Sequence, residues 1–366
     1  MEQIDVAVVG GGVVGLAAAC AAAERGLSVC VFERQPRPGL EASTHNSGVI
    51  HAGIYYPKDS LKARLCVDGR ERLYQFCVDH SIPHERCGKL IIASEDHEVP
   101  RLETLLRQGH ENGVEDLEVV DRAFIRRLEP HVEGAAALWS PSTGIIEAET
   151  FVRRLAQRAS HLGVHLLPGT EVASGAPAHD GVTLLTNRER VAARVVVNAA
   201  GLYADDVSAA LGGEPFSIYP VRGEYAELTP AARHLVGRPV YPLPDASGHS
   251  LGVHLTRTTW GSVMLGPTAS YQKDKDDYEG SRLPVEAFHE SARRLLPDLK
   301  LDDLRPGGTG IRARPARPEQ TFADFIVRRD AIVPALVHAA GIDSPGLTAC
   351  LAIGDTVVGL VEEALG

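Results

Sequence analysis

Three glycines near the start of the chain have the spacing of a motif that binds phosphate groups. Gly10, Gly12 and Gly15 form the pattern Gly-x-Gly-x-x-Gly. In this pattern the first glycine makes a tight turn, the second lets the backbone approach a pyrophosphate, and the third lets a helix pack on a strand. Glu33 follows Gly15 by 18 residues, close to the usual position of the carboxylate that binds ribose hydroxyls. The residues therefore predict dinucleotide binding.

The elements around these glycines predict a βαβ unit. Residues 4–9 form a β-branched run typical of a strand, and an alanine-rich segment after Gly15 predicts a helix that ends at Gly26. Residues 27–32 predict a second strand that places Glu33 at its end. A helix N-terminus that follows such a turn faces the phosphates. The alternative is a glycine-rich turn in an unrelated α/β protein.

The rest of the chain predicts an α/β fold whose second domain is α+β. Helical spacing predicts helices over residues 59–78, 101–111, 122–128, 147–161, 284–296 and 347–365. Apolar and β-branched runs predict strands over residues 89–93, 164–167, 182–185, 191–198, 221–228, 250–256, 262–266 and 335–340. The change to a β pattern after residue 219 indicates a change of domain.

This order of elements predicts a discontinuous Rossmann-like domain with an inserted antiparallel-sheet domain. We assign residues 1–85, 145–215 and 320–366 to the nucleotide-binding domain, and residues 86–144 and 216–319 to a substrate or cap domain. The single nucleotide fingerprint argues against a separate domain for a pyridine nucleotide.

Composition excludes several classes of protein. The formal charge is −11, from 48 acidic and 37 basic side chains, so binding to nucleic acid is not expected. With 44% hydrophobic and 23% charged residues, the chain has the composition of a globular protein rather than a disordered one. The apolar stretch over residues 6–23 is interrupted by glycines and lacks a basic leader, so we expect no signal peptide.

The six cysteines indicate a reducing compartment. None of them forms a Cys-x-x-Cys pair, so neither disulfides nor a structural metal site is expected. We therefore expect a cytoplasmic protein that binds no metal ion, with peripheral contact to a membrane left open.

Segments spread over nearly the whole chain carry a family resemblance. They are residues 43–56, 61–63, 87–90, 128–130, 140–146, 197–205, 220–225, 251–256 and 310–313. Together they resemble the L-2-hydroxyglutarate oxidase/dehydrogenase branch of the D-amino-acid-oxidase-like FAD oxidoreductases.

The resemblance implies FAD, held non-covalently, with its adenine end on the N-terminal unit and its flavin ring between the two domains. The residues implied to hold it are Gly10, Gly12, Gly15, Glu33, Arg34, Thr44, His45, Asn46, Ser47, Gly48, Val172, Ala200, Gly201, Gly310, Gly346 and Leu347. The helix after Gly346 would aim its N-terminus at the pyrimidine edge of the flavin and stabilise the charge of the reduced ring.

Oxidation of a 2-hydroxy acid needs a base within hydrogen-bond reach of the hydroxyl group. Histidine suits this role because its ordinary pKa of about 6.5 leaves much of it neutral at pH 7. By the resemblance, His51 ends a segment beside the flavin ring, and we predict that it is the base. His254, in a β-rich stretch expected to face the ring, is predicted to contact substrate or to act as the alternate base.

Carboxylates of the substrate need fixed cations, and the arginine side chain matches a carboxylate in a bidentate geometry. Arg312, which is flanked by glycines, is the first choice for the α-carboxylate, and Arg222 is the second. Tyr55, Tyr56 and Lys62 are predicted to contact a distal carboxylate.

These features predict an enzyme that oxidises a small 2-hydroxy acid, with L-2-hydroxyglutarate as the best candidate, by hydride transfer to flavin N5. Alternatives within the superfamily are oxidation of glycerol 3-phosphate and oxidation of an amino acid or secondary amine. An alternative outside enzymes is a flavin-binding sensor module. The partners implied are a small anionic substrate and an electron acceptor, which is oxygen, a quinone or a redox protein.

Overall fold

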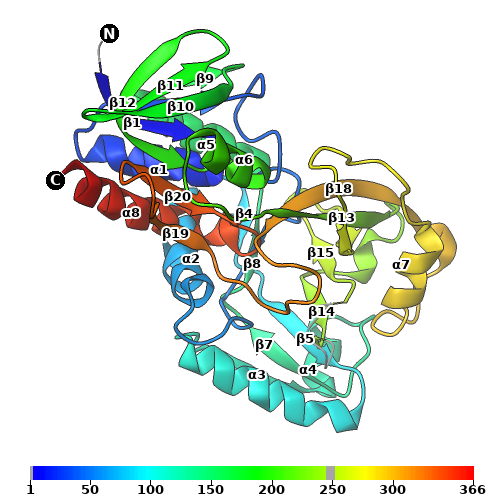
Figure 1. The fold of residues 1–366 in the computed structure, drawn as a ribbon. Helices are drawn as coiled ribbons and strands as arrows, with labels where there is room; N and C mark the ends of the chain where they lie inside the picture. The colour runs from blue at the N-terminus through cyan, green and yellow to red at the C-terminus, as the bar shows by residue number, and fades with distance from the viewer. Residues whose placement is uncertain (1–2, 245–251) are drawn as a thin grey trace.

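The computed structural model describes residues 3–244 and 252–366, and these residues form two large β-sheets and one small sheet. The first large sheet lies with its helices at one end of the molecule, and the second large sheet lies toward the other (Figure 1). Both termini lie at the first end. The predicted fold class, a Rossmann-like domain combined with an antiparallel-sheet domain, is confirmed.

The first sheet contains the predicted βαβ unit. Its strands are β1 (Gln3–Val9), β2 (Val29–Glu33), β9 (His165–Pro168), β10 (Val172–Ala178), β11 (Gly181–Thr186), β12 (Arg190–Asn198), β19 (Ile326–Arg329) and β20 (Leu336–Ala340). The order is β10-β11-β12-β1-β2-β9, and β20 pairs with β12 and β19. β1 runs parallel to both β2 and β12. Because parallel neighbours end at the same edge, the turns after β1, β2 and β12 lie together.

Five helices belong to this half of the molecule. They are α1 (Val13–Glu24), α2 (Leu61–Asp79), α5 (Ala148–His161), α6 (Ala204–Ala210) and α8 (Gly346–Leu365). α8 packs against both α1 and α2. Leu16, Leu73 and Ile353, one from each of these three helices, belong to one buried cluster. The helix nearest the C-terminus therefore completes the core around the first helix.

The second sheet is mainly antiparallel. Its strands are β5 (Lys89–Ala93), β6 (Glu118–Asp121), β7 (Ala136–Ser140), β13 (Tyr219–Leu228), β14 (Val240–Pro242), β15 (Leu255–Arg257), β16 (Val263–Leu265), β17 (Ser270–Tyr271) and β18 (Leu304–Arg314). The helices of this half are α3 (Val99–Glu111), α4 (Arg122–Leu128) and α7 (Val285–Ala292). The chain enters this sheet at β5, leaves it, and returns at β13, so its strands come from two separated parts of the sequence.

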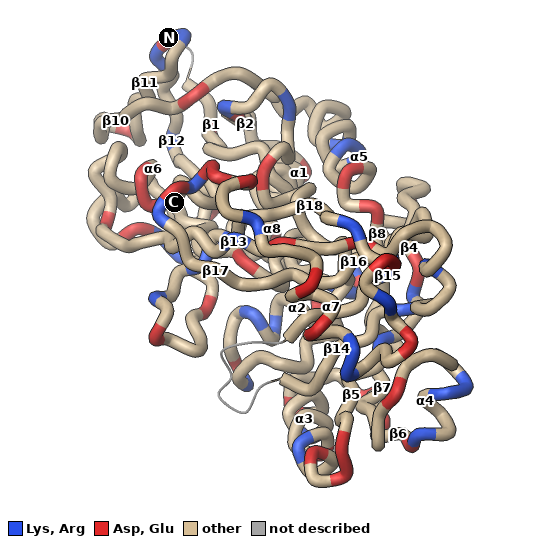
Figure 2. Tube along the Cα trace, turned by 90° about the vertical axis from the view of Figure 1, so that its right-hand side faces the viewer, with Lys and Arg blue, Asp and Glu red and all other residues tan. Residues whose placement is uncertain are grey.

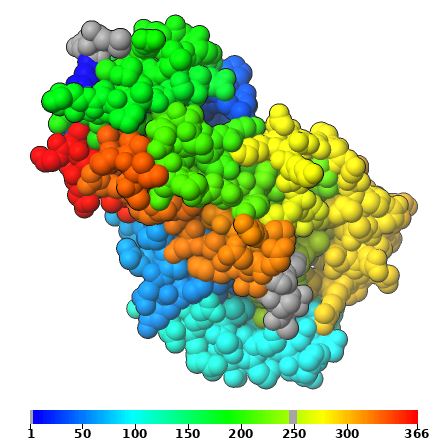
Figure 3. Space-filling model, in the orientation of Figure 1, coloured from blue at the N-terminus to red at the C-terminus, as the bar shows by residue number. Residues whose placement is uncertain are grey.

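The remaining elements are short. The small sheet consists of β3 (Val49–Ile50), β4 (His84–Glu85) and β8 (Gly144–Ile146), and the 3-10 helices are η1 (Asp96–Glu98), η2 (Gly201–Tyr203), η3 (Arg233–Leu235) and η4 (Leu301–Asp303). The segment between β18 and β19, orange in Figure 3, lies over the junction of the two halves.

Two predicted elements differ from the structure, and one strand was not predicted. The helix predicted over 284–296 ends at Ala292, and the strand predicted over 250–256 begins at Leu255, with its first two residues outside the described part of the chain. The long strand β18 was not predicted, because Pro306 and three glycines within it hide the strand pattern.

Charged residues of both signs alternate along the surface. In Figure 2, Lys and Arg are interspersed with Asp and Glu, without a long basic stripe on the face shown. Within the described residues, no helix has the length and apolar character needed to cross a bilayer.

Candidate active site

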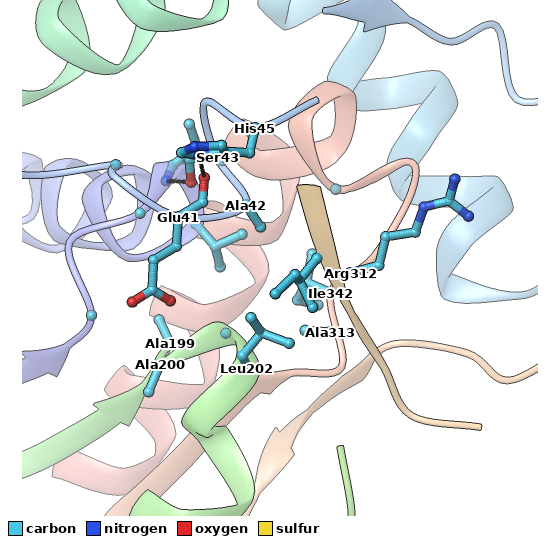
Figure 4. Close-up of a pocket in the computed structure, with 18 of the residues that line it drawn as sticks. Glu41, Ala42, Ser43, His45, Ala199, Ala200, Leu202, Arg312, Ala313 and Ile342 are labelled. Carbon is cyan, nitrogen blue, oxygen red and sulfur yellow. Dashed lines mark hydrogen bonds between the residues drawn. The ribbon is translucent and has the colours of Figure 1, made fainter. Parts of the chain in front are cut away.

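A cavity of about 450 Å³ opens where the turns of the first sheet meet the second sheet. Its lining includes most of the residues predicted to bind cofactor or substrate: Gly10, Gly12, Glu33, Arg34, His45, Asn46, Ser47, His51, Val172, Ala200, Gly201, His254, Gly310, Arg312, Gly346 and Leu347. Figure 4 shows Glu41, Ser43 and His45 on one wall, with Arg312 and Ile342 on another.

The turn between β1 and α1 requires glycine at two of its positions. Gly10 has a φ of +109°, and a Cβ there would lie 2.4 Å from the carbonyl oxygen of Ala199. A Cβ on Gly15 would lie 2.0 Å from the carbonyl oxygen of Gly10, so Gly15 supports the turn from behind and does not line the cavity. Gly12, the N-cap of α1, has no side chain to cap the helix, and Gly12, Val13 and Val14 all line the cavity, so the N-terminus of α1 faces it.

Glu33 closes the turn at the end of β2. Its carboxylate accepts hydrogen bonds from the backbone N–H groups of Gly11 at 2.8 Å and Gln35 at 2.7 Å. Burial raises the pKa of this carboxyl group. Beside it, the Arg34 guanidinium forms an ion pair with Glu41 at 2.5 Å and lies 3.6 Å from the centre of the Tyr203 ring. Arg34 thus helps to shape this wall of the cavity.

The segment 43–48 forms a tight loop over the start of α1. Ser43 Oγ accepts a hydrogen bond from the Val13 N–H at 3.0 Å, and the Asn46 side chain donates to two carbonyl groups of its own loop. Thr44 and Gly48, which were predicted to line the cofactor site, lie outside the cavity lining. The Thr44 hydroxyl donates instead to the carbonyl oxygen of Gly39, so it holds the loop in shape.

His51 lies at the end of the cavity formed by the second sheet and α8. Its backbone N–H donates to Thr348 Oγ1 at 3.0 Å, and its Nε2 lies 3.3 Å from Ser344 Oγ. Its Nδ1 is buried and has no hydrogen-bond partner among the described residues. Burial, with contributions from the cations of Lys89 and Arg312, lowers the pKa of His51 to about 3. The imidazole is therefore neutral at pH 7 and has a nitrogen able to accept a proton.

An aromatic wall faces this histidine. Tyr241 of β14 stacks on His254, with ring centroids 3.4 Å apart and planes at 8°. Both residues are buried, and both line the cavity together with Tyr225 of β13. Burial raises the pKa of Tyr225 and Tyr241, so both phenols stay protonated near neutral pH and can donate hydrogen bonds.

Arg312 enters the cavity from β18. Within the described chain it forms no ion pair with a carboxylate, so its guanidinium is available to an anion. The strand reaches this position because Gly310 passes the preceding loop closely: a Cβ there would lie 2.1 Å from the carbonyl oxygen of His45.

Four residues predicted to bind substrate lie outside the cavity lining: Arg222, Tyr55, Tyr56 and Lys62. Lys62 is buried and forms an ion pair with Asp343 at 2.6 Å. Arg222 is also buried and pairs with Glu224 at 3.2 Å and Asp277 at 3.7 Å. Their charges are compensated within the protein, so neither is the free cation that the prediction required.

Sequence reasoning did not single out several residues of the site. Tyr225, Tyr241, Ser344, Glu41 and Ser43 all line the cavity. Tyr225 and Ser43 stand in segments that carried the family resemblance, and Ser344 precedes the predicted C-terminal helix, so position could have marked them. Tyr241 lies in a three-residue strand with no local signal.

Comparison with known proteins identifies the family. A family model described as FAD dependent oxidoreductase matches residues 5–360. The chain is 34% identical to a protein of Nematostella vectensis named "L-2-hydroxyglutarate dehydrogenase, mitochondrial", over 99% of this chain and 91% of the relative. The human protein with the same name is 32% identical, over 99% and 89%. An L-2-hydroxyglutarate dehydrogenase of Indibacter alkaliphilus is 30% identical, over 97% and 98%.

Solved structures agree with this assignment. The chain matches an FAD-bound, dithionite-reduced L-alpha-glycerophosphate oxidase of Mycoplasma pneumoniae with a TM-score of 0.89 and 28% identity, covering 99% of this chain and 95% of that one. A glycine oxidase of Geobacillus kaustophilus matches with a TM-score of 0.85 at 24% identity, covering 99% and 95%, which shows a shared fold.

Proposed function

The chain belongs to the FAD-dependent oxidoreductase family, and we propose that it oxidises L-2-hydroxyglutarate to 2-oxoglutarate. The observation that carries this proposal is the pairing of a neutral, half-buried histidine, His51, with an uncompensated cation, Arg312, in one cavity. A base and a carboxylate-binding group are the two functions that a 2-hydroxy acid demands. The names of the related dehydrogenases support the choice of this acid.

The residues of the cavity fit FAD. The glycine turn leaves room for a pyrophosphate beside the N-terminus of α1, and Glu33 stands at the position of a ribose-binding carboxylate. At the adenine end, Thr170 contributes a buried hydroxyl without a partner among the described residues. A bound FAD would supply the acceptor for the hydride that leaves C2 of the substrate. We infer that it is held non-covalently by these groups.

His51 is assigned the role of base. Ser344 Oγ lies 3.3 Å from its Nε2 and holds the ring, and the unprotonated ring nitrogen of the neutral imidazole accepts the hydroxyl proton. The backbone hydrogen bond to Thr348 ties the histidine to the first turn of α8. The same turn presents Gly346 and Leu347 to the cavity, where the positive end of the helix stabilises negative charge on the reduced cofactor.

Arg312 and the aromatic wall position the substrate. The guanidinium binds the α-carboxylate in a bidentate geometry, which holds C2 and its hydroxyl group against His51. His254, stacked on Tyr241, contacts the substrate from the side of the second sheet.

An electron acceptor must reoxidise the cofactor, and we infer that this acceptor is oxygen, a quinone or a redox protein. A quinone or a redox protein is compatible with peripheral contact to a membrane. We further infer a reducing, cytoplasmic environment, because all six cysteines are free and five of them are buried.

Anaerobic bleaching of the flavin absorbance tests the substrate directly. The panel contains L- and D-2-hydroxyglutarate, malate, lactate, glycerol 3-phosphate, sarcosine, glycine and D-alanine. We expect rapid bleaching by L-2-hydroxyglutarate, with the D-enantiomer as the matched control. Bleaching by glycerol 3-phosphate in its place would favour the activity named for the Mycoplasma pneumoniae structure. Bleaching by an amine would contradict the role of His51 as base, because a neutral amine needs no removal of a hydroxyl proton.

A further inference from the structure

Lys89, the first residue of β5, is a buried cation next to the catalytic end of the cavity. The residue is 1% exposed. Its Nζ lies 4.7 Å from the ring centroid of Tyr241, which lines the cavity, and 4.8 Å from that of Tyr55. Lys89 is also one of the two cations that act on His51. Its ammonium group therefore lies one aromatic ring away from the proposed reaction centre.

No carboxylate in the described residues forms an ion pair with Lys89, which distinguishes it from the other buried cations. Lys62 pairs with Asp343, and Arg222 pairs with Glu224 and Asp277. Two aromatic faces replace the missing anion for Lys89 and stabilise the ammonium only in part. Burial of a charge without a carboxylate partner is costly, and burial lowers the pKa of Lys89 to about 7. A bound anion would supply the missing partner.

Lys89 and Arg312 approach His51 from different strands. Lys89 comes from β5, whereas Arg312 comes from β18, and these two strands are not neighbours in the second sheet. The charges of both cations lower the pKa of the His51 imidazole. A substrate whose hydroxyl group contacts His51 can therefore direct one carboxylate toward Arg312 and another toward Lys89. The buried hydroxyl of Tyr55, which has no partner within the described chain, offers a further donor on the Lys89 side.

We propose that Lys89, assisted by the Tyr55 hydroxyl, binds the second carboxylate of the substrate and so makes the enzyme selective for 2-hydroxy dicarboxylates over 2-hydroxy monocarboxylates. This inference rests on the proposed oxidation of a 2-hydroxy acid in the cavity. Lys89 does not line the cavity itself, so the proposal requires its flexible stem to carry the ammonium past the edge of Tyr241 when a dicarboxylate binds. Lys89 thereby takes the role that the sequence had assigned to Lys62.

The test compares two substrates in the holoenzyme and in Lys89→Met. L-2-Hydroxypentanoate has a methyl group where L-2-hydroxyglutarate has its second carboxylate. Flavin reduction by each acid is followed anaerobically at pH 7 by stopped-flow absorbance. In the unmodified enzyme we expect the dicarboxylate to reduce the flavin with a clearly higher ratio of rate constant to dissociation constant than the monocarboxylate does. Lys89→Met should lower that selectivity roughly 10- to 150-fold, the range for loss of one charge-assisted hydrogen bond.

Lys62→Met is the matched control. It removes a second buried lysine, but one whose ammonium already pairs with Asp343. We expect it to change the efficiency of both substrates by a similar factor and to leave the selectivity unchanged. Equal loss for both substrates in Lys89→Met would overturn the proposal, since it would show that Lys89 acts on folding or on His51 alone.

Binding to the unmodified holoenzyme provides a second measurement that does not depend on a variant. Glutarate and pentanoate are titrated while the flavin spectrum is recorded. We expect glutarate to bind at least 10-fold more tightly at pH 7 and to lose affinity toward pH 9, because the carboxylate prefers the protonated ammonium. Cys66, Tyr55, Tyr241 and His51, the other titratable groups around this lysine, do not titrate in that interval: burial raises the pKa of the thiol and both phenols and lowers the pKa of the imidazole. Equal affinity for the two acids would overturn the proposal.

These measurements separate the proposed function from the assignment of Lys89. If L-2-hydroxyglutarate does not reduce the flavin of the unmodified enzyme, the proposed function is wrong. If it reduces the flavin no more efficiently than L-2-hydroxypentanoate does, only the assignment of Lys89 is wrong.

Discussion

The two ends of the cavity differ in whether backbone or side chains line them. At the end formed by the first sheet, the surface consists largely of backbone, with Gly10 and Gly12 in the turn and Ala200 and Gly201 opposite. At the end formed by the second sheet and α8, it consists of large side chains such as Tyr241. Backbone binds the parts of a cofactor that never vary, whereas side chains can be exchanged without moving the chain. The comparison indicates that substrate choice can change while the cofactor end stays constant.

The geometry of the end formed by the first sheet is also set by residues that are close together in the sequence. Gly10, Gly15 and Glu33 lie within one βαβ unit, and their contacts are set by the turn that they form. The second end draws His51 and Arg312 from segments far apart in the chain. Its geometry therefore depends on how the two large sheets pack, and its electrostatics depend on burial more than on neighbours in sequence.

The largest expected effect tests the backbone end. In Gly10→Ala, the new Cβ would lie 2.4 Å from the carbonyl oxygen of Ala199 at a φ of +109°, so the turn must shift. We expect protein that retains little flavin and unfolds at a lower temperature, measured by absorbance and thermal denaturation. Gly359→Ala in α8 is the control, because its Cβ would meet no atom within 4 Å. Equal flavin content in the two variants would contradict the conclusion that the backbone of the turn holds the cofactor.

The next effect concerns the base at the side-chain end. His51→Asn should slow flavin reduction by roughly 10²- to 10⁴-fold, the usual contribution of a positioned general base. Flavin content should be unchanged, because the glycine turn is untouched. Stopped-flow absorbance measures the rate, and the flavin-to-protein ratio is the control. Turnover within threefold of the unmodified enzyme would exclude the base role.

Replacement of the substrate cation should have a smaller effect. Arg312→Lys keeps the charge but loses the planar fork, and Arg312→Met loses both. We expect a loss of roughly 10- to 150-fold in kcat/KM for Arg312→Met, from one charge-assisted hydrogen bond or more, and an intermediate loss for Arg312→Lys. Unchanged kinetics in Arg312→Lys would show that bidentate binding is not used.

The smallest effect is a shift in pH dependence. His51 acts in its neutral form, and its pKa of about 3 means that acid should not inactivate it between pH 7 and pH 5. Because the cation of Arg312 is the smallest of the three causes of this lowered pKa, Arg312→Met should move the acidic limb of the rate profile slightly upward. The measurement is the rate of flavin reduction against pH. If the rate of flavin reduction in the unmodified enzyme fell with a midpoint near pH 6.5, the lowered pKa of His51 would be contradicted.

The same contrast explains what could be predicted from the sequence. The βαβ unit and its acid followed from local spacing, because the turn that joins β1 to α1 needs those residue types wherever it occurs. The ion pair of Lys62 with Asp343 could not be predicted, because the two residues lie far apart in sequence and only the packing of α2 beside the start of α8 brings them together. Tyr241 carried no local signal, because it lies in a three-residue strand. Lys89 stands in the segment 87–90 that carried the family resemblance, but its spacing predicted only the start of a strand.

The position of α8 has a consequence for the order of assembly. This helix packs on α1 and α2, and its first turn supplies one wall of the cavity. During synthesis the glycine turn at residues 10–15 leaves the ribosome long before residues 346–365 do. The cofactor site therefore stays incomplete until almost the whole chain has been synthesised. We expect FAD to be loaded after translation has passed α8, and the exposed α1 surface to depend on chaperones until then.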